Sequence, residues 1–156
     1  MEKEPEPLME IKWIDAKEDK DLKDANDLKD AFFVRREVFI KEQNVPEEEE
    51  FDEADPESHH VVIYADGKPV ATGRLFKTEE SWLIGRIAVL KDYRGKHAGK
   101  LVVEKLLEKA SEMGAEEIHV HAQTHATNFY RKSGFVEYGT TFQESGIEHI
   151  SMIKRL

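Results

Sequence analysis

The segment that most constrains the fold covers residues 86–110 and reads RIAVLKDYRGKHAGKLVVEKLLEKA. It begins with a short apolar run, which is typical of a buried strand, and then passes through a loop that contains two glycines. After the loop, apolar residues recur at helical spacing through residues 97–113, and Gly114 follows where a helix commonly ends. The segment therefore predicts a strand that turns directly into a helix.

The loop between this strand and this helix is rich in cations, although the whole chain carries a formal charge of -10. The first N–H groups of a helix have no partner within the helix, and the helix dipole adds partial positive charge at that end. Glycine lets an anion approach the backbone closely, and Arg94, Lys96 and Lys100 add full charges. We therefore predict a phosphate-binding loop; the alternative is a basic helix start that only makes a turn.

The spacing of the loop excludes two common nucleotide-binding motifs. Three residues separate Gly95 from Gly99, and Leu101 stands where a Walker A loop needs a hydroxyl. The Gly-x-Gly-x-x-Gly spacing of dinucleotide-binding folds also fails to match. A magnesium nucleotide is therefore not the predicted ligand.

The remaining segments predict an α/β or α+β fold, with one mixed sheet covered by helices. Residues 60–76 form the clearest hairpin, because the turn dipeptide Asp66-Gly67 separates two β-rich runs. Further strands are predicted at residues 11–15, 81–90, 117–123, 135–139 and 146–156, and helices at residues 21–41, 97–113 and 125–135.

The 156 residues suffice for one domain, which we place at residues 10–156, after a flexible leader rich in Glu and Pro at residues 1–9. That leader lacks the apolar stretch of a signal peptide, and no run approaches the roughly 20 apolar residues of a membrane span. We therefore expect a cytoplasmic protein without a membrane partner. The acidic balance argues against nucleic-acid binding, and the absence of cysteine excludes disulfides, thiolate metal sites and a cysteine nucleophile.

An acidic segment, EQNVPEEEEFDEADPES, covers residues 42–58 and is predicted to be a loop. One interpretation is a solvated acidic turn. The other is a border of a site for a cationic substrate, with Glu42, Asp52 and Asp55 as candidate wall residues.

Residues 86–110 resemble the acyl-CoA pyrophosphate-binding segment of the GNAT superfamily of N-acetyltransferases, which reads Gln/Arg-x-x-Gly-x-Gly/Ala. Arg94 occupies the first position of that motif and Gly99 the last, whereas His97 replaces its first glycine. Residues 125–135, HATNFYRKSGF, resemble the second CoA-contacting element of the family, A-x-x-F-Y-x-K-x-G-F.

Other segments extend this resemblance over residues 10–156. The segment VRREVFIKEQNVPEEEEFDEAD, the hairpin HHVVIYADGKPVATGRL and the segment GIEHISM are similar to the ElaA-like or YjcF-like branch. The resemblance implies the GNAT fold, a twisted mixed sheet of about seven strands with about four helices. The strand ending at Val89 and the strand starting near Glu117 would diverge, and the pantetheine arm of acetyl-CoA would lie between them.

The resemblance also implies the residues that contact CoA. Backbone amides of the first strand would bind pantetheine, the basic loop would bind the pyrophosphate, and the short helix would complete the site. These residues are Ile87, Ala88, Val89, Arg94, Gly95, Lys96, His97, Ala98, Gly99, Lys100, Gln123, Asn128, Phe129 and Lys132.

Acetyl transfer to an amine needs a base, because an ammonium with a pKa of about 10 must lose a proton before it attacks. The resemblance assigns protonation of the departing thiolate to Tyr130; the alternative is a tyrosine that only fills the core. His149 is the first candidate for the base, because it lies in the segment GIEHISM and imidazole titrates near neutrality. The other candidates are His60, His121, Glu42 and Asp55.

The histidines at positions 119, 121 and 125 raise the question of a metal site, but no cysteine or carboxylate completes a recognisable ligand set. We therefore predict no metal, and direct transfer from acetyl-CoA to a primary amine of a small molecule or a protein in a ternary complex. The alternative is a CoA-binding module without turnover that serves as a sensor or interaction protein. A homodimer is a further expectation, because small domains of the family often pair.

Overall fold

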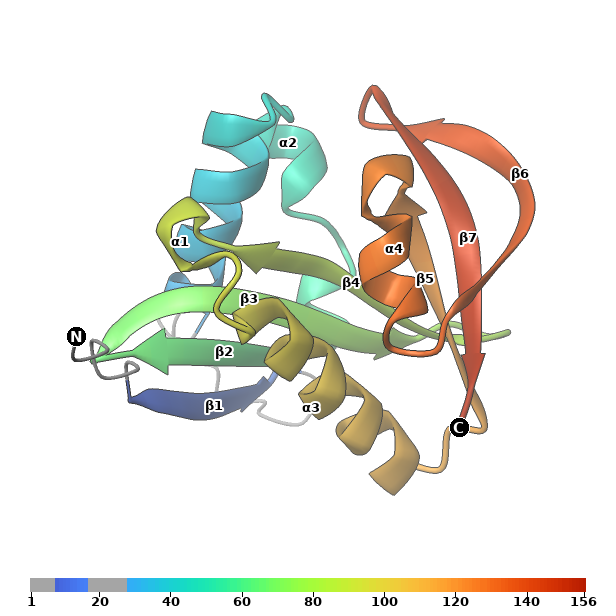
Figure 1. The fold of residues 1–156 in the computed structure, drawn as a ribbon, viewed down its shortest axis with the longest axis horizontal. Coiled ribbons are helices and arrows are strands. Elements are labelled where there is room, and N and C mark those ends of the chain that lie inside the picture. The colour runs from blue at the N-terminus through green and yellow to red at the C-terminus, as the bar shows by residue number, and fades with distance from the viewer. Residues whose placement is uncertain (1–7, 17–27) are drawn as a thin grey trace, which may run out of the picture.

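The computed structural model describes residues 8–16 and 28–156, and its strands form one seven-stranded sheet (Figure 1). The strand order is β1-β2-β3-β4-β5-β7-β6, and only the β4–β5 pair is parallel. This confirms the predicted mixed sheet. The strands are β1 (Met9–Asp15), β2 (His59–Ala65), β3 (Lys68–Lys77), β4 (Trp82–Val89), β5 (Glu117–Gln123), β6 (Val136–Glu144) and β7 (Ile147–Arg155).

Helices connect these strands, and all of them lie in predicted places except α2, which falls in the segment that was predicted to be a loop. The α-helices are α1 (Lys29–Arg35), α2 (Glu47–Glu50), α3 (Ala98–Glu112) and α4 (Thr127–Arg131). The first of them continues as a π-helical segment, η1 (Arg36–Glu42), and short 3₁₀ turns occur at η2 (Asp55–Glu57), η3 (Lys91–Tyr93) and η4 (Thr124–Ala126).

Two sequence predictions fall partly outside the described residues. The predicted leader extends to residue 9, but residues 1–7 are not described and Met9 already belongs to β1. The predicted helix at residues 21–41 is confirmed from Lys29 onward, and its residues 21–27 are not described. None of the helices in the described ranges combines the length and the hydropathy that crossing a bilayer requires.

The predicted β2–β3 hairpin turns at Asp66 and Gly67, which have φ angles of 50° and 80°. Positive φ at both central residues is the conformation of a two-residue turn whose twist matches that of the flanking strands. The turn pairs Ala65 with Lys68 and so fixes the register of the hairpin.

The sheet has a helix-covered core on each face. Alternate residues of β2 separate the two cores, since Val61 and Ile63 pack with α3 residues, whereas Val62 packs with Ala31 of α1. In Figure 1, α3 lies in front of β2 and β3, whereas α1 lies behind the sheet, and both helices contact β2, β3 and β4. Because both faces are covered, consecutive residues of these strands are buried, from His59 to Ile63 in β2 and from Val70 to Leu75 in β3.

β4 and β5 are joined by very little pairing. Their parallel ladder contains two residue pairs, Leu83↔His119 and Ile84↔Val120. Beyond these pairs the two strands separate, as the family resemblance implied. A bulge helps them to part, because the register of β3 and β4 shifts near Arg86, which has a φ of 50°.

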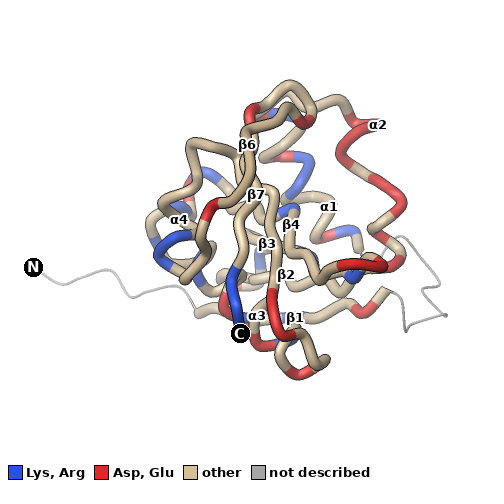
Figure 2. The backbone as a smooth tube through the Cα atoms, turned by 90° about the vertical axis from the view of Figure 1, so that its right-hand side faces the viewer, with Lys and Arg blue, Asp and Glu red and all other residues tan. Residues whose placement is uncertain are grey.

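The acidic segment 42–58 is anchored by a buried ion-pair network rather than being a solvated turn. Arg35 contacts Glu50 at 2.8 Å and Asp55 at 2.7 Å, and these three residues are 1%, 2% and 4% exposed. Arg74 bonds to Asp55 at 2.8 Å and to Asp52 at 2.6 Å. Figure 2 shows acidic residues along α2, where Glu47, Glu48 and Glu49 are exposed and Glu50 is buried.

Two candidates for the base are therefore placed in the core instead of a site. Asp55 lies within the network, so the predictions that it borders a substrate site or acts as a base are wrong. His60 is 1% exposed, and burial lowers its pKa to about 4. Its Nε2 lies 2.9 Å from the carbonyl oxygen of Asp55, which only accepts, so that nitrogen donates and holds no free electron pair.

Replacing Asp55 by Asn should lower the free energy of unfolding by about 3 kcal/mol, because Arg35 and Arg74 would lose a shared buried partner. Urea denaturation at pH 7 measures this loss. The matched control is Glu53→Gln, an exposed change in the same segment, which should alter stability by less than about 0.5 kcal/mol. Equal stability of the two variants would contradict a structural role for the network.

Candidate functional site

The gap between β4 and β5 is lined by backbone amides of β4. The Leu90 N–H donates to the Val70 carbonyl, and Ala88 pairs with Thr72, so these two residues face β3. Since the amides of a strand alternate in direction, those of Ile87 and Val89 point away from β3 and toward the gap.

Ala88, which was expected to contact CoA, does not face the gap. Its backbone faces β3, and its side chain packs with Val34 and Val38 on the other side of the sheet. The bulge at Arg86 determines which residues face the gap, and no residue pattern predicted it.

The first turn of α3 presents free N–H groups next to this gap. The first helical bond runs from the Leu101 N–H to the His97 carbonyl at 3.0 Å, and no side chain caps the helix among the described residues. The N–H groups of Ala98, Gly99 and Lys100 therefore have no partner within the helix. This end of α3 has the geometry of an anion-binding site, as the sequence predicted.

His97 adopts a left-handed backbone conformation, with φ of 63° and ψ of 7°. That conformation is unfavourable for a residue with a Cβ atom, which explains why glycine is usual at this position of the resembled motif. The replacement by His changes the local strain and leaves the direction of the following N–H groups intact. His97 is exposed, so its imidazole is accessible to a ligand at the loop.

Gly99 allows three elements to converge. A Cβ atom at this position would lie 3.3 Å from the Phe129 ring of α4 and 3.4 Å from Val89 Cγ2 of β4. The start of α3 is therefore seated against both the end of β4 and the short helix α4. Phe129, a CoA contact implied by the resemblance, therefore lies beside the basic loop.

Arg94, the first residue of the predicted phosphate motif, is already paired. Its guanidinium contacts both carboxylate oxygens of Glu42 at 2.7 Å and donates to the Val89 carbonyl at 3.0 Å. The hydrogen bond from Arg94 holds the pKa of Glu42 below its usual value. Glu42 is thus a partner of the loop cation in this structure, and the sequence did not predict the pair.

Tyr130 lies in the core on the α3 side of the sheet. Its ring contacts Phe129 and Phe135 edge-on, with centroid distances of 5.0 and 5.8 Å. Burial raises the pKa of its phenol, so the hydroxyl stays protonated at neutral pH. Within residues 8–16 and 28–156 this hydroxyl has no hydrogen-bond partner.

The other predicted contacts of CoA are distributed around this region. The Gln123 amide is engaged with Gln43 in a reciprocal pair, at 2.9 and 3.4 Å, so it is not free for a ligand. Asn128 accepts a hydrogen bond from Arg131 at 3.0 Å. Lys96 lies over the Tyr93 ring at 5.5 Å. Gly95, Lys100 and Lys132 are exposed.

A polar cluster occupies the opposite face of the sheet, where β5, β6 and β7 meet. Glu144 lies 3.5 Å from His121 Nδ1 and 3.6 Å from His149 Nε2. The hydrogen bond from His121 lowers the pKa of Glu144, so this carboxylate is ionised at neutral pH. The sequence predicted both histidines as candidates and missed Glu144.

A signal for Glu144 was nevertheless present. Ser145 and Gly146 form a two-residue turn with positive φ, which pairs Glu144 with Ile147 across the hairpin. Recognising this turn would have placed Glu144 two residues from Phe142, the cross-strand partner of His149.

The histidines of β5 do not assemble a metal site. His119 contacts the Tyr138 hydroxyl at 2.7 Å and Glu117 at 3.3 Å, and His125 lies on the exposed turn η4. Among the described residues, no group of three histidine, aspartate or glutamate side chains is arranged to hold a metal ion.

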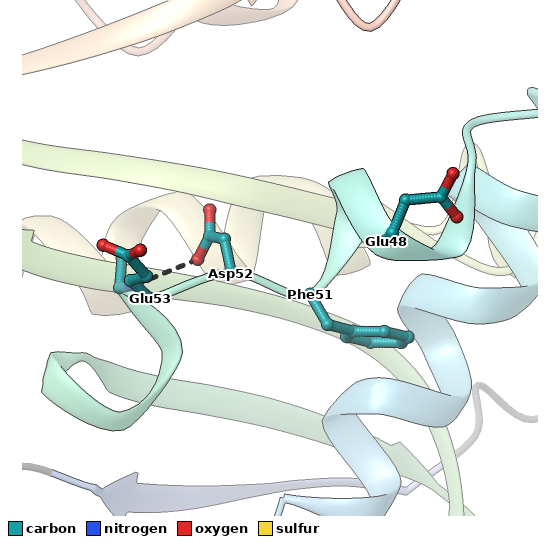
Figure 3. A pocket seen from close by; sticks show the side chains of 5 residues that line it. Glu48, Phe51, Asp52 and Glu53 are labelled. Atoms are coloured by element: carbon teal, nitrogen blue, oxygen red, sulfur yellow. Dashed lines mark hydrogen bonds between the residues drawn. The ribbon is translucent and has the colours of Figure 1, made fainter.

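A shallow acidic depression lies on α2 and the segment after it (Figure 3). Glu48, Phe51, Asp52 and Glu53 line it, and the Phe51 ring turns toward α1, where it packs on Phe32 at 4.7 Å. Burial opposes ionisation of Asp52, but hydrogen bonds and charge from Arg74 and Arg86 lower its pKa to about 2. Asp52 is therefore already paired with Arg74 and Arg86. Only part of this surface matches the predicted border of a site for a cationic substrate.

Comparison with known proteins identifies the family. The family model described as an acetyltransferase (GNAT) domain matches residues 17–156. The chain belongs to the GNAT acetyltransferase family. It is therefore an acyl-CoA-dependent acyltransferase, and the resemblance identified from its sequence is confirmed.

Individual GNAT relatives agree. The N-acetyltransferase YjcF of Bacillus subtilis is 44% identical over 114 residues, which cover 72% of this chain and 81% of YjcF. Escherichia coli ElaA is 25% identical in its crystal structure, with a TM-score of 0.78 over 95% of this chain and 100% of ElaA. The PaiA N-acetyltransferase of Thermoplasma acidophilum, solved with coenzyme A, shares the fold at 16% identity, with a TM-score of 0.70 over 96% of this chain and 99% of PaiA.

Replacing His97 by Gly should raise the free energy of unfolding by about 1 kcal/mol, because glycine adopts positive φ without the steric conflict of a Cβ atom. Chemical denaturation measures this change. His97→Ala is the control for the imidazole, since alanine keeps the conflict and should give no gain. Stabilisation by Ala equal to that by Gly would show that the side chain, and not the backbone, is the source of strain.

Proposed function

We propose that the protein is an N-acetyltransferase that transfers the acetyl group of acetyl-CoA directly to a primary amine in a ternary complex. The observation that carries this proposal is the short β4–β5 ladder of two residue pairs. Beyond it, the amides of Ile87 and Val89 face outward, and the uncapped start of α3 packs against the end of β4 and against Phe129, the neighbour of Tyr130. Family membership supports acyl transfer, and this geometry supports a linear thioester as the donor.

The residues at the gap fit the separate chemical parts of CoA. The N–H groups of Ala98, Gly99 and Lys100 would hold the pyrophosphate, assisted by the charge of Lys96. The amides of Ile87 and Val89 would hold the pantetheine arm, whose own amides are suited to pairing with a strand edge. The complex of PaiA with coenzyme A supports this use of the shared fold.

Arg94 would approach the phosphates only by rearranging its contact with Glu42. Both groups lie on the surface, where an ion pair of this kind contributes about 1 kcal/mol or less. A diphosphate can therefore compete for the guanidinium at little cost. Until it does, Glu42 keeps Arg94 next to the loop instead of extended into solvent.

Tyr130 is suited to donate a hydrogen bond to the sulfur of the departing thiolate. Its phenol is protonated, unpaired with the protein and surrounded by aromatic rings. A donor in a water-poor environment stabilises developing negative charge more effectively than water does. Because its pKa is raised, the Tyr130 phenol keeps its proton until the thiolate forms, and it then donates a hydrogen bond to the sulfur.

His149 is suited to act as the base because its tautomer is fixed. Its Nδ1 lies 2.7 Å from the Ile147 carbonyl oxygen, which only accepts, so Nδ1 carries the proton. The electron pair of the neutral ring therefore resides on Nε2. That atom faces Glu144 on the side of the sheet opposite to Tyr130.

The test of the proposed function is release of thiol from acetyl-CoA in the presence of a panel of primary amines. The protein contains no cysteine, so the assay has no background from protein thiols. This composition also leaves no cysteine for an acyl-enzyme, which favours direct transfer. Absence of turnover together with tight binding of CoA would support the non-catalytic binding module instead.

Tyr130→Phe should lower kcat by about 100-fold while the Kd for CoA stays unchanged, because the ring is kept and only the donor is lost. Steady-state thiol release and calorimetry measure the two quantities. Phe135→Leu is a packing control in the same cluster, and it should affect stability more than kcat. An unchanged kcat in Tyr130→Phe, with chemistry limiting the rate, would remove Tyr130 from the mechanism.

The double variant Arg94→Ala, Lys96→Ala should bind CoA about tenfold or more weakly, whereas its affinity for pantetheine should not change. The reason is that pantetheine lacks the pyrophosphate that these cations would contact. Calorimetric titration with both ligands measures the difference. Lys105→Ala, further along α3, is the control; equal losses for both ligands would mean that the loop does not hold phosphate.

A further inference from the structure

The carboxylate of Glu144 is bordered by two histidines and remains open to solvent. It lies 3.5 Å from His121 and 3.6 Å from His149, and its side chain is 44% exposed. Neutral imidazoles bring no charge to balance an ionised carboxylate. When both rings are neutral, no ion pair balances the negative charge of Glu144, and only the more distant charge of Arg86 acts on it, so an external cation can reach an unpaired carboxylate.

Four carboxylates of the acidic segment 42–58 already have arginine partners. Glu50 contacts Arg35 and Arg86, Asp52 contacts Arg74 and Arg86, and Asp55 contacts Arg35 and Arg74. Glu42 contacts Arg94. Glu144 differs from these groups, because its ion-pair contacts within the described residues are to the two histidines, and no arginine lies in direct contact with it.

The register of the strands places this cluster on one side of the gap. His149 pairs with Gln123 of β5 and with Phe142 of β6, so these side chains share a face of the sheet. That face is opposite to Val120 and Ala122, which pack in the α3 core together with Tyr130. In Figure 1, the β6–β7 turn and α2 lie at the same end of the molecule.

We propose that Glu144, with His121 and His149 beside it, forms the subsite for the acceptor, which binds a protonated primary alkylamine. The carboxylate receives the ammonium, and His149 Nε2 removes its proton. This inference rests on the proposed function and names the acceptor class for that site. Placing the acceptor and Tyr130 on opposite faces lets the amine approach the thioester from one side while the sulfur departs on the other.

The protons and bonds of the transfer balance with these groups. The ammonium gives one proton to His149, and the free electron pair of nitrogen forms the new C–N bond as the C–S bond breaks. Nitrogen then loses a second proton, and the thiolate sulfur gains one with Tyr130 as its hydrogen-bond donor. One net proton is released to solvent, and no oxidant or metal is required.

Proton NMR of the histidine rings tests the subsite without requiring turnover. Butylammonium is titrated into the CoA-bound protein at pH 7.5, and the signals are assigned with His121→Gln and His149→Gln. Saturable shifts of both rings are expected, and 1-butanol, which has the same chain without the charge, should produce none. Glu144→Gln should weaken the binding of butylammonium by about tenfold or more.

Two matched variants complete the experiment. Glu148→Gln removes an exposed carboxylate from the same hairpin and should bind butylammonium as the wild type does. Glu144→Asp keeps the charge and should bind more tightly than Glu144→Gln. Butylammonium shifts that are absent in the wild type, or unchanged in Glu144→Gln, overturn the subsite.

Calorimetry with CoA separates the two levels of the proposal. If every variant binds CoA but butylammonium leaves both rings unperturbed, the acceptor subsite is wrong and the proposed donor site stands. If the wild type does not bind CoA, the proposed function fails, and the acceptor subsite fails with it.

Discussion

Two residue pairs between β4 and β5 hold the two halves of the sheet together, and the rest of the site depends on how few they are. A full parallel ladder would satisfy the backbone amides of β4 and leave nothing for a ligand. With pairing limited to Leu83↔His119 and Ile84↔Val120, the amides that follow are left without a strand partner. The start of α3 and the ring of Phe129 then pack against the end of β4, so the opening has donors along it and positive charge at its mouth.

An open sheet needs support from elsewhere, and the buried arginine network supplies it on the β4 side. Arg35 of α1 and Arg74 of β3 share Asp55, which brings the acidic segment against the sheet. Arg86 extends the network to the bulge in β4, where it contacts Glu50. Removing charged side chains from water costs free energy, which offsets much of what their ion pairs contribute to stability. Such networks therefore matter as much for holding a specific geometry as for stabilising the fold. In this protein the network holds β4 in its path along the gap.

The sequence predicted the parts of this protein that depend on local chemistry. Periodicity located the strands and helices, and the dipeptide Asp66-Gly67 identified its turn, because neighbouring residues decide these features. The sequence did not predict contacts between segments that are distant along the chain. Asp55 finds its partners 20 and 19 residues away along the chain, so its burial could not be read from an acidic run. Glu144 was missed for the same reason, since three strands must pair before it meets its histidines.

The amide pair between Gln43 and Gln123 has a consequence for how the protein responds to its medium. It ties the end of η1, which packs over β4, to the far strand β5 through neutral groups alone. Dissolved electrolyte screens ionic attraction and barely alters a contact between uncharged amides. The separation of the two strands should therefore persist in concentrated brine, while retention of a polyanion by the basic loop declines. A titration with sodium chloride should therefore weaken the binding of a polyanion while the separation of β4 and β5 stays the same.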